Sequence, residues 1–128
     1  MSLLKILVVD DHKMIRDGIK SMLQEENEYL IVGEASNGKQ ALNILKDTDI
    51  DVVIMDINMP EMNGYEAVKV LRSKLETASI PIMMLTGKSD VESEIKGLDI
   101  GADDYMGKPF DSGRLLARVK MLIRKSYA

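Results

Sequence analysis

Five short apolar runs, each followed by a segment of helical period, constrain the fold of this chain more than any other feature of its sequence. Their starts lie about 22 to 28 residues apart, which is the length of a strand plus a crossover helix. The runs are Leu4–Val9, Tyr29–Glu34, Val52–Met55, Ile80–Leu85 and a weaker one at Asp104–Gly107. Strands that alternate with helices predict an α/β domain, and runs that are apolar almost throughout predict parallel strands covered on both faces.

Helix signals lie between these runs. Ser89 followed by Glu92 has the spacing of a capping box, and Gly101 stands where that helix is expected to end. Asp111 has the position of an amino-terminal cap for a last helix. The apolar stripe of the expected first helix consists of Ile15, Ile19, Met22 and Leu23.

Composition limits the classes of protein to which the chain can belong. Its 128 residues carry 17 Lys and Arg against 21 Asp and Glu, giving a formal net charge of −4, and none is a cysteine. We expect one domain over residues 1–128, with no output domain in this chain, no membrane span and no secretory signal. The acidic balance argues against direct nucleic-acid binding, and the absence of thiols is compatible with a cytoplasmic location.

Acidic residues end two of the predicted strands. Asp10 and Asp11 follow the first run, and Asp56 follows the third. If the strand order is 2-1-3-4-5, these carboxylates converge, and two of them about 4 Å apart repel by about 4 kcal/mol at an effective dielectric near 20. Either one carboxyl stays protonated or a hard cation such as Mg²⁺ lies among them. The alternative is that the Asp pair forms an exposed turn or a helix cap.

Two further polar residues end the remaining strands. Thr86 follows the fourth run and Lys108 follows the fifth. Singly, each is typical of a turn, a cap or a solvated surface. Together with the acids they supply a nucleophile, a cation site, a hydroxyl donor and a fixed positive charge, which phosphoryl transfer requires.

Five ordered motifs resemble the receiver domain of bacterial two-component response regulators. They are Asp10-Asp11, VVIMDINMPEMNG around Asp56, LTG with Thr86, GADDY with Tyr105, and KPF at Lys108 to Phe110. The resemblance covers essentially the whole chain. It implies a flavodoxin-like (βα)5 fold, with a doubly wound five-stranded parallel sheet of order 2-1-3-4-5 and helices on both faces.

The resemblance assigns a role to each matching residue. Asp56 is implied as the phosphoacceptor. Asp11 and Asp56 would bind Mg²⁺ directly, with Mn²⁺ as a possible substitute, whereas Asp10 would bind it through water and Asn58 through its backbone carbonyl.

The remaining motif residues are implied to sense the phosphoryl group. Lys108 and Thr86 would contact its oxygens, and Tyr105 resembles the aromatic switch residue that moves inward with Thr86. A cis peptide bond is implied before Pro109. One position departs from the family pattern, because Gly87 stands where Ala is usual.

The function implied is two-component phosphorelay signalling rather than that of a dedicated enzyme. The domain would take a phosphoryl group from the phosphohistidine of a sensor histidine kinase or a phosphotransfer protein, and would support its own phosphotransfer and autodephosphorylation. The face built by the fourth helix, fifth strand and fifth helix would then bind a partner or a second copy. Alternatives are a haloacid-dehalogenase-type phosphatase, disfavoured by the order of the acids, and a receiver that only binds partners.

Several residues invite other interpretations. The segment GEASNGKQ nearly matches a nucleotide-binding loop, but Gln40 lacks a hydroxyl for Mg²⁺, and Asn37 with Gln40 predicts a helix start instead. His12 is interpreted as an exposed polar residue at the start of the first helix. Met59 and Met62, in the loop after Asp56, are candidates for contact with a partner.

Overall fold

The computed structural model describes residues 3–86, 95–96, 100–108 and 111–126, and it contains a five-stranded parallel sheet. The strand order is β2-β1-β3-β4-β5, as the sequence predicts. The strands are β1 (Leu4–Val9), β2 (Tyr29–Ala35), β3 (Val52–Asp56), β4 (Ile82–Thr86) and β5 (Asp104–Gly107). The labelled helices are α1 (Lys13–Gln24), α2 (Gly38–Asp47), α3 (Gly64–Ser73) and α5 (Ser112–Ser126).

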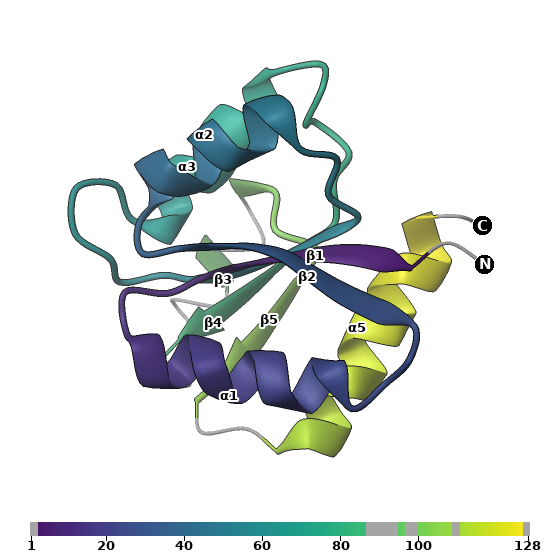
Figure 1. Ribbon diagram of the computed structural model, residues 1–128. Coiled ribbons are helices and arrows are strands. Elements are labelled where there is room, and N and C mark those ends of the chain that lie inside the picture. The colour runs from purple at the N-terminus through teal and green to yellow at the C-terminus, as the bar shows by residue number, and fades with distance from the viewer. Residues whose placement is uncertain (1–2, 87–94, 97–99, 109–110, 127–128) are drawn as a thin grey trace.

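Helices cover both faces of the sheet, with α1 and α5 on one side and α2 and α3 on the other (Figure 1). Two apolar clusters fill the two interfaces, because successive side chains of a strand point to opposite faces. Leu7, Val53 and Met84 belong to the cluster under α2 and α3. Their neighbours one position along, such as Val8 and Leu85, belong to the cluster under α1 and α5. This alternation explains why β3 and β4 are buried along their whole length.

The helix starts agree with the caps in the sequence. Asn37 Oδ1 accepts a hydrogen bond from the Gln40 N–H at 3.0 Å, which confirms that GEASNGKQ is a helix start. Asp111 Oδ1 accepts one from the Arg114 N–H at 2.7 Å before α5. The helix expected between Ser89 and Gly101 lies largely outside the described residues.

Three strands differ from the predicted runs. β2, β3 and β4 each end one residue later than predicted, at Ala35, Asp56 and Thr86, and β4 also begins later. β3 includes Asp56, whose backbone pairs with Leu85. β4 begins at Ile82 instead of Ile80, because the Ile80 N–H bonds to the Thr77 carbonyl in a turn and Pro81 has no N–H to donate.

Arg72 of α3 ties together the edge of the sheet at which β4 and β5 begin. Its Nη1 donates to the Ile80 carbonyl at 2.7 Å, its Nε donates to the Gly101 carbonyl at 2.8 Å, and its Nη2 lies 2.7 Å from Asp103 Oδ2. Gly101 has a φ of +117°, a region that favours glycine, and a Cβ there would lie 3.0 Å from Arg72 Cγ. Within the described part of the chain, no helix is long and apolar enough to cross a lipid bilayer.

Candidate functional site

Strand register brings Asp10, Asp56 and Lys108 to one edge of the sheet. Val8 of β1 pairs with Ile54 of β3, so that Asp10 and Asp56, each two residues further on, leave the sheet side by side. Asp56 pairs with Leu85, which pairs with Met106, and Lys108 follows Met106 by two residues. Because strand side chains alternate, Asp56, two residues after Ile54, belongs to the α1 and α5 side of the sheet.

Lys108 connects the two buried carboxylates. Its Nζ lies 2.7 Å from Asp10 Oδ2 and 3.2 Å from Asp56 Oδ1. Asp10 is 0% exposed and Asp56 4% exposed, so this electrostatic contact is shielded from water. Asp56 Oδ1 also accepts the Ile57 N–H at 3.0 Å. One cation therefore faces two buried acids.

This imbalance perturbs the ionisation of Asp56. Burial raises the pKa of Asp56, and the charge of Asp10 raises it further, against the opposing effect of Lys108. For Lys108, burial alone would lower the pKa, but the hydrogen bond to Asp10 and the charge of Asp56 outweigh it and raise the pKa. Lys108 is thus held as a cation, whereas the ionised Asp56 carboxylate lacks sufficient positive charge around it.

Every polar atom of Asp10 has a partner within the chain. Its N–H donates to the Ala35 carbonyl at 3.0 Å, and its own carbonyl accepts from Arg16 Nη1 at 2.6 Å. Its Oδ1 accepts the His12 N–H at 2.9 Å, while Oδ2 binds Lys108. Asp10 is therefore fixed in place, and both of its carboxylate oxygens are already engaged.

The acidic residues and the neighbouring histidine can hold a divalent cation. Asp10, Asp11, His12 and Asp56 each offer a ligand atom, and these atoms all lie within 4.8 Å of one another. Carboxylate oxygens suit Mg²⁺, which keeps several waters, and the partly exposed Asp11 leaves a side of the site open to solvent. The uncompensated charge on Asp56 gives a cation a further electrostatic reason to bind there. The residues present therefore fit Mg²⁺.

His12 is part of this cluster, which the sequence interpretation did not anticipate. It is exposed and precedes α1, as predicted. Its Nδ1, however, lies 3.1 Å from Asp11 Oδ1 and 3.3 Å from Asp10 Oδ1. The only signal in the sequence was its position directly after the acidic pair.

Thr86 and Tyr105 lie on the opposite face of the sheet from Asp56, by the alternation of strand side chains. Thr86 ends β4 and is buried, and its carbonyl accepts the Lys108 N–H at 2.6 Å. Tyr105 pairs with Met84, two residues before Thr86, and belongs to the core under α2 and α3. Its hydroxyl is buried and has no hydrogen-bond partner among the described residues.

The loop after Asp56 packs closely against the end of β3. The Gly64 N–H donates to the Ile57 carbonyl at 2.8 Å, and a Cβ on Gly64 would lie 2.5 Å from the Asp56 carbonyl oxygen. Asn58 is exposed in this loop.

The expected partner contact by the loop methionines is not supported. Met59 is buried in the core under α2 and α3, and Met62 is partly buried against that same core. Met59 is therefore not exposed to a partner, and Met62 packs against the core. Gly87 and Pro109, with its predicted cis bond, lie outside the described residues.

Comparisons with known proteins agree with this geometry. The family model described as "Response regulator receiver domain" matches residues 6–120. The chain is 38% identical over 120 residues to the transcriptional regulatory protein YdfI of Bacillus subtilis (strain 168), covering 94% of this chain and 55% of YdfI. It is 39% identical over 123 residues to the transcriptional regulatory protein CpxR of Escherichia coli (strain K12), covering 96% of this chain and 50% of CpxR. The chain thus spans about half the length of the curated relatives it matches.

A solved structure of similar size gives the same result. The chemotaxis response regulator CheY4 of Vibrio cholerae superposes with a TM-score of 0.87 at 34% identity, covering 94% of this chain and 99% of CheY4. Sequence match, strand order and fold similarity therefore lead to one assignment: the chain belongs to the family of response regulator receiver domains of two-component systems.

Proposed function

We propose that this chain accepts a phosphoryl group on Asp56, with Mg²⁺ bound by the neighbouring acids, and that its donor is a phosphohistidine of a sensor histidine kinase or a phosphotransfer protein. The observation that carries the proposal is the buried Asp56 carboxylate, flanked by Asp10 and only 3.2 Å from Lys108 Nζ. We place this activity in the cytoplasm and assign it to a single receiver domain over residues 1–128.

The reaction is an in-line displacement at phosphorus. An Asp56 carboxylate oxygen forms a bond to phosphorus while the bond from phosphorus to the donor nitrogen breaks, and its electron pair stays on the donor imidazole. Lys108 neutralises charge on the phosphoryl oxygens, and the Thr86 hydroxyl donates a hydrogen bond to one of them. In hydrolysis, water attacks the same phosphorus, and the bond to Asp56 breaks to release phosphate and restore the carboxylate.

When bound, Mg²⁺ supplies electrostatic stabilisation of the negative charge that develops on the phosphoryl oxygens. Asp11 and Asp56 are proposed as direct ligands, together with the backbone carbonyl of Asn58. Asp10 is proposed to act through water, since Lys108 and the His12 N–H already occupy its carboxylate oxygens.

The signal is proposed to leave the site through Thr86 and Tyr105. Phosphorylation adds about two negative charges and three acceptor oxygens at one point, which draws Thr86 toward the phosphoryl group. Tyr105 shares the sheet face of Thr86 and lies in β5. We propose that a movement of Tyr105 changes the surface built by β5, α5 and the helix predicted after Ser89. Phosphorylation shifts the population between two pre-existing conformations of this surface, and one of them binds a partner protein or a second copy of the chain.

Intact-mass measurement with acetyl phosphate tests the proposal. With Mg²⁺ present, we expect the mass to increase by one phosphoryl group, and the increase to disappear with EDTA or with Asp56→Asn. Asp47→Asn, which changes an exposed aspartate on α2, is the matched control and should be modified like the wild type. An unchanged mass of the folded wild type, or modification that persists in Asp56→Asn, would overturn the proposal.

A further inference from the structure

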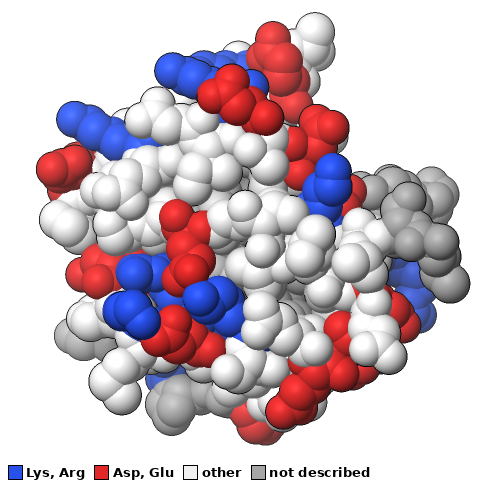
Figure 2. All heavy atoms as spheres, in the orientation of Figure 1, with Lys and Arg blue, Asp and Glu red and all other residues white. Residues whose placement is uncertain are grey.

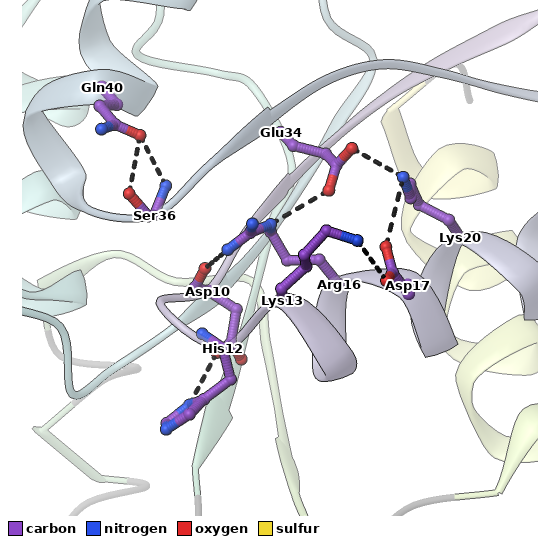
Figure 3. A network of polar contacts seen from close by, with 9 residues as sticks. All are labelled: Asp10, His12, Lys13, Arg16, Asp17, Lys20, Glu34, Ser36 and Gln40. Carbon is purple, nitrogen blue, oxygen red and sulfur yellow. Dashed lines mark hydrogen bonds and ion pairs between the residues drawn. The ribbon is translucent and has the colours of Figure 1, made fainter.

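Arg16 of α1 links strand β2 to the backbone of the acidic site. Its Nη1 donates to the Asp10 carbonyl at 2.6 Å, and its Nε donates to Glu34 Oε1 at 3.0 Å. The second Glu34 oxygen, Oε2, accepts from Lys20 Nζ at 2.7 Å (Figure 3). Glu34 therefore lies between two cations and fixes the plane of the Arg16 guanidinium group.

This network remains charged at neutral pH. The hydrogen bond from Lys20, and after it the bond from Arg16, lower the pKa of Glu34 against the effect of its partial burial. Figure 2 shows Lys and Arg side by side with Asp and Glu over the start of α1, whereas a group of acidic side chains lies over the far end of α1. The positive charge of Arg16 is thus balanced locally by Glu34 and does not oppose a cation at the acidic site.

The carbonyl that Arg16 holds belongs to the peptide group joining Asp10 to Asp11. On the other side of Asp10, the backbone is fixed by the bond from its N–H to Ala35. Rotation of the Asp10–Asp11 peptide would shift the starting point of the Asp11 side chain. Within the described part of the chain, that side chain is held by one ion pair, to His12. The position of Asp11 therefore depends on the peptide that Arg16 anchors.

We propose that Arg16, oriented by Glu34, is a positioning residue that sets the Asp10–Asp11 peptide for binding of the divalent cation. This inference rests on the proposed function, because it takes the acidic cluster as the cation site. Arginine suits the task because its planar fork donates in two fixed directions, toward Glu34 and toward the Asp10 carbonyl. A lysine offers a single charged group and cannot make both bonds in this geometry.

The test is the Mg²⁺ dissociation constant, measured by isothermal titration calorimetry on the wild type, Arg16→Gln and Arg16→Lys. Loss of a residue that orients metal ligands weakens metal binding about 10- to 100-fold. We expect Arg16→Gln to raise the dissociation constant by about tenfold, and Arg16→Lys to restore only part of the loss. At saturating Mg²⁺, Arg16→Gln should still be labelled on Asp56 by acetyl phosphate to the wild-type extent.

Arg72→Gln is the matched control. Arg72 also donates to backbone carbonyls, but at the opposite edge of the sheet, so its loss should lower the melting temperature without changing the Mg²⁺ dissociation constant. If Arg16→Gln behaves in the same way, Arg16 is merely structural and the inference is overturned.

Two further results keep the test decisive. If Arg16→Gln does not fold, Glu34→Gln takes its place, since it keeps Arg16 but removes the charge that orients it. A raised dissociation constant in Glu34→Gln supports the inference, and an unchanged one overturns it. If the wild type neither binds Mg²⁺ nor is labelled, the proposed function itself is contradicted. If the wild type does both and the variants have the same Mg²⁺ dissociation constant as the wild type, only the positioning role is contradicted.

Discussion

Replacing Lys108 with methionine removes the one cation that contacts both buried acids in the described part of the chain. Its Nζ lies 2.7 Å from Asp10 and 3.2 Å from Asp56, which at an effective dielectric of about 20 corresponds to gross attractions of about 6 and 5 kcal/mol. Most of this attraction offsets the cost of taking the charges out of water. Breaking a buried ion pair by removing one partner costs about 3–5 kcal/mol of stability. We use the lower end of this range, because a carboxylate left without Lys108 can be neutralised by a proton or hydrated by water that enters the site.

We therefore expect Lys108→Met to lower the free energy of unfolding by about 3 kcal/mol in EDTA. At about 2.1 cal/mol/K of unfolding entropy per residue, this loss lowers the melting temperature by about 11 °C. Added Mg²⁺ should raise the melting temperature more in Lys108→Met than in the wild type, because the acids then have no competing cation. Calorimetry or circular dichroism with and without Mg²⁺ provides the measurement.

Lys13→Met is the control for this experiment. Lys13 pairs with Asp17 at 2.9 Å, but its side chain is 77% exposed, against 16% for Lys108. An exposed pair of this kind contributes little to stability because water and salt screen it, so the control should melt close to the wild type. If Lys108→Met in EDTA also melts within about 2 °C of the wild type, the reasoning from buried charge is refuted.

Three further predictions concern neighbouring residues. Because burial and the charge of Asp10 raise the pKa of Asp56, the folded protein loses stability as the pH rises from the unfolded pKa of this group through its higher folded pKa. Asp56→Asn should therefore be more stable than the wild type at pH 7 in EDTA, and a lower urea midpoint would contradict this. Tyr105→Phe removes a buried hydroxyl without a partner among the described residues, so its urea midpoint should be unchanged or higher. Gly64→Ala places a Cβ 2.5 Å from the Asp56 carbonyl and should cost more than about 1 kcal/mol while slowing acetyl phosphate labelling; wild-type stability would show that the loop can adjust.

The sequence predicted the parts of the site that depend on strand register. Asp10, Asp56 and Lys108 converge because each follows an apolar run, and parallel strands in this order end at the same edge. Such predictions need only the period of the strands and their order. The same reasoning placed Thr86 at the end of the neighbouring strand, whereas Tyr105, inside β5, was implied only by the family resemblance.

Contacts that depend on side-chain torsions could not be predicted in this way. Nothing in the local sequence shows that Arg16 reaches back to the Asp10 carbonyl, or that Arg72 joins three segments near the start of β4 and β5. The prediction for Met59 is wrong for a related reason, since a position in a loop does not show whether the side chain is buried in the core. The start of β4 could not be located from apolar residues alone, because Ile80 is apolar but belongs to the turn before the strand.

The complete hydrogen bonding of Asp10 restricts which residue can occupy that position. Two donors, the His12 N–H and the Lys108 ammonium group, approach its two carboxylate oxygens from different sides. Asparagine has nearly the same shape, but either orientation of its amide would turn an NH2 group toward one of these donors. Glutamate keeps the charge but adds a methylene where no surface is exposed. Position 10 therefore requires aspartate because both of its side-chain oxygens accept hydrogen bonds, and not only because it carries a negative charge.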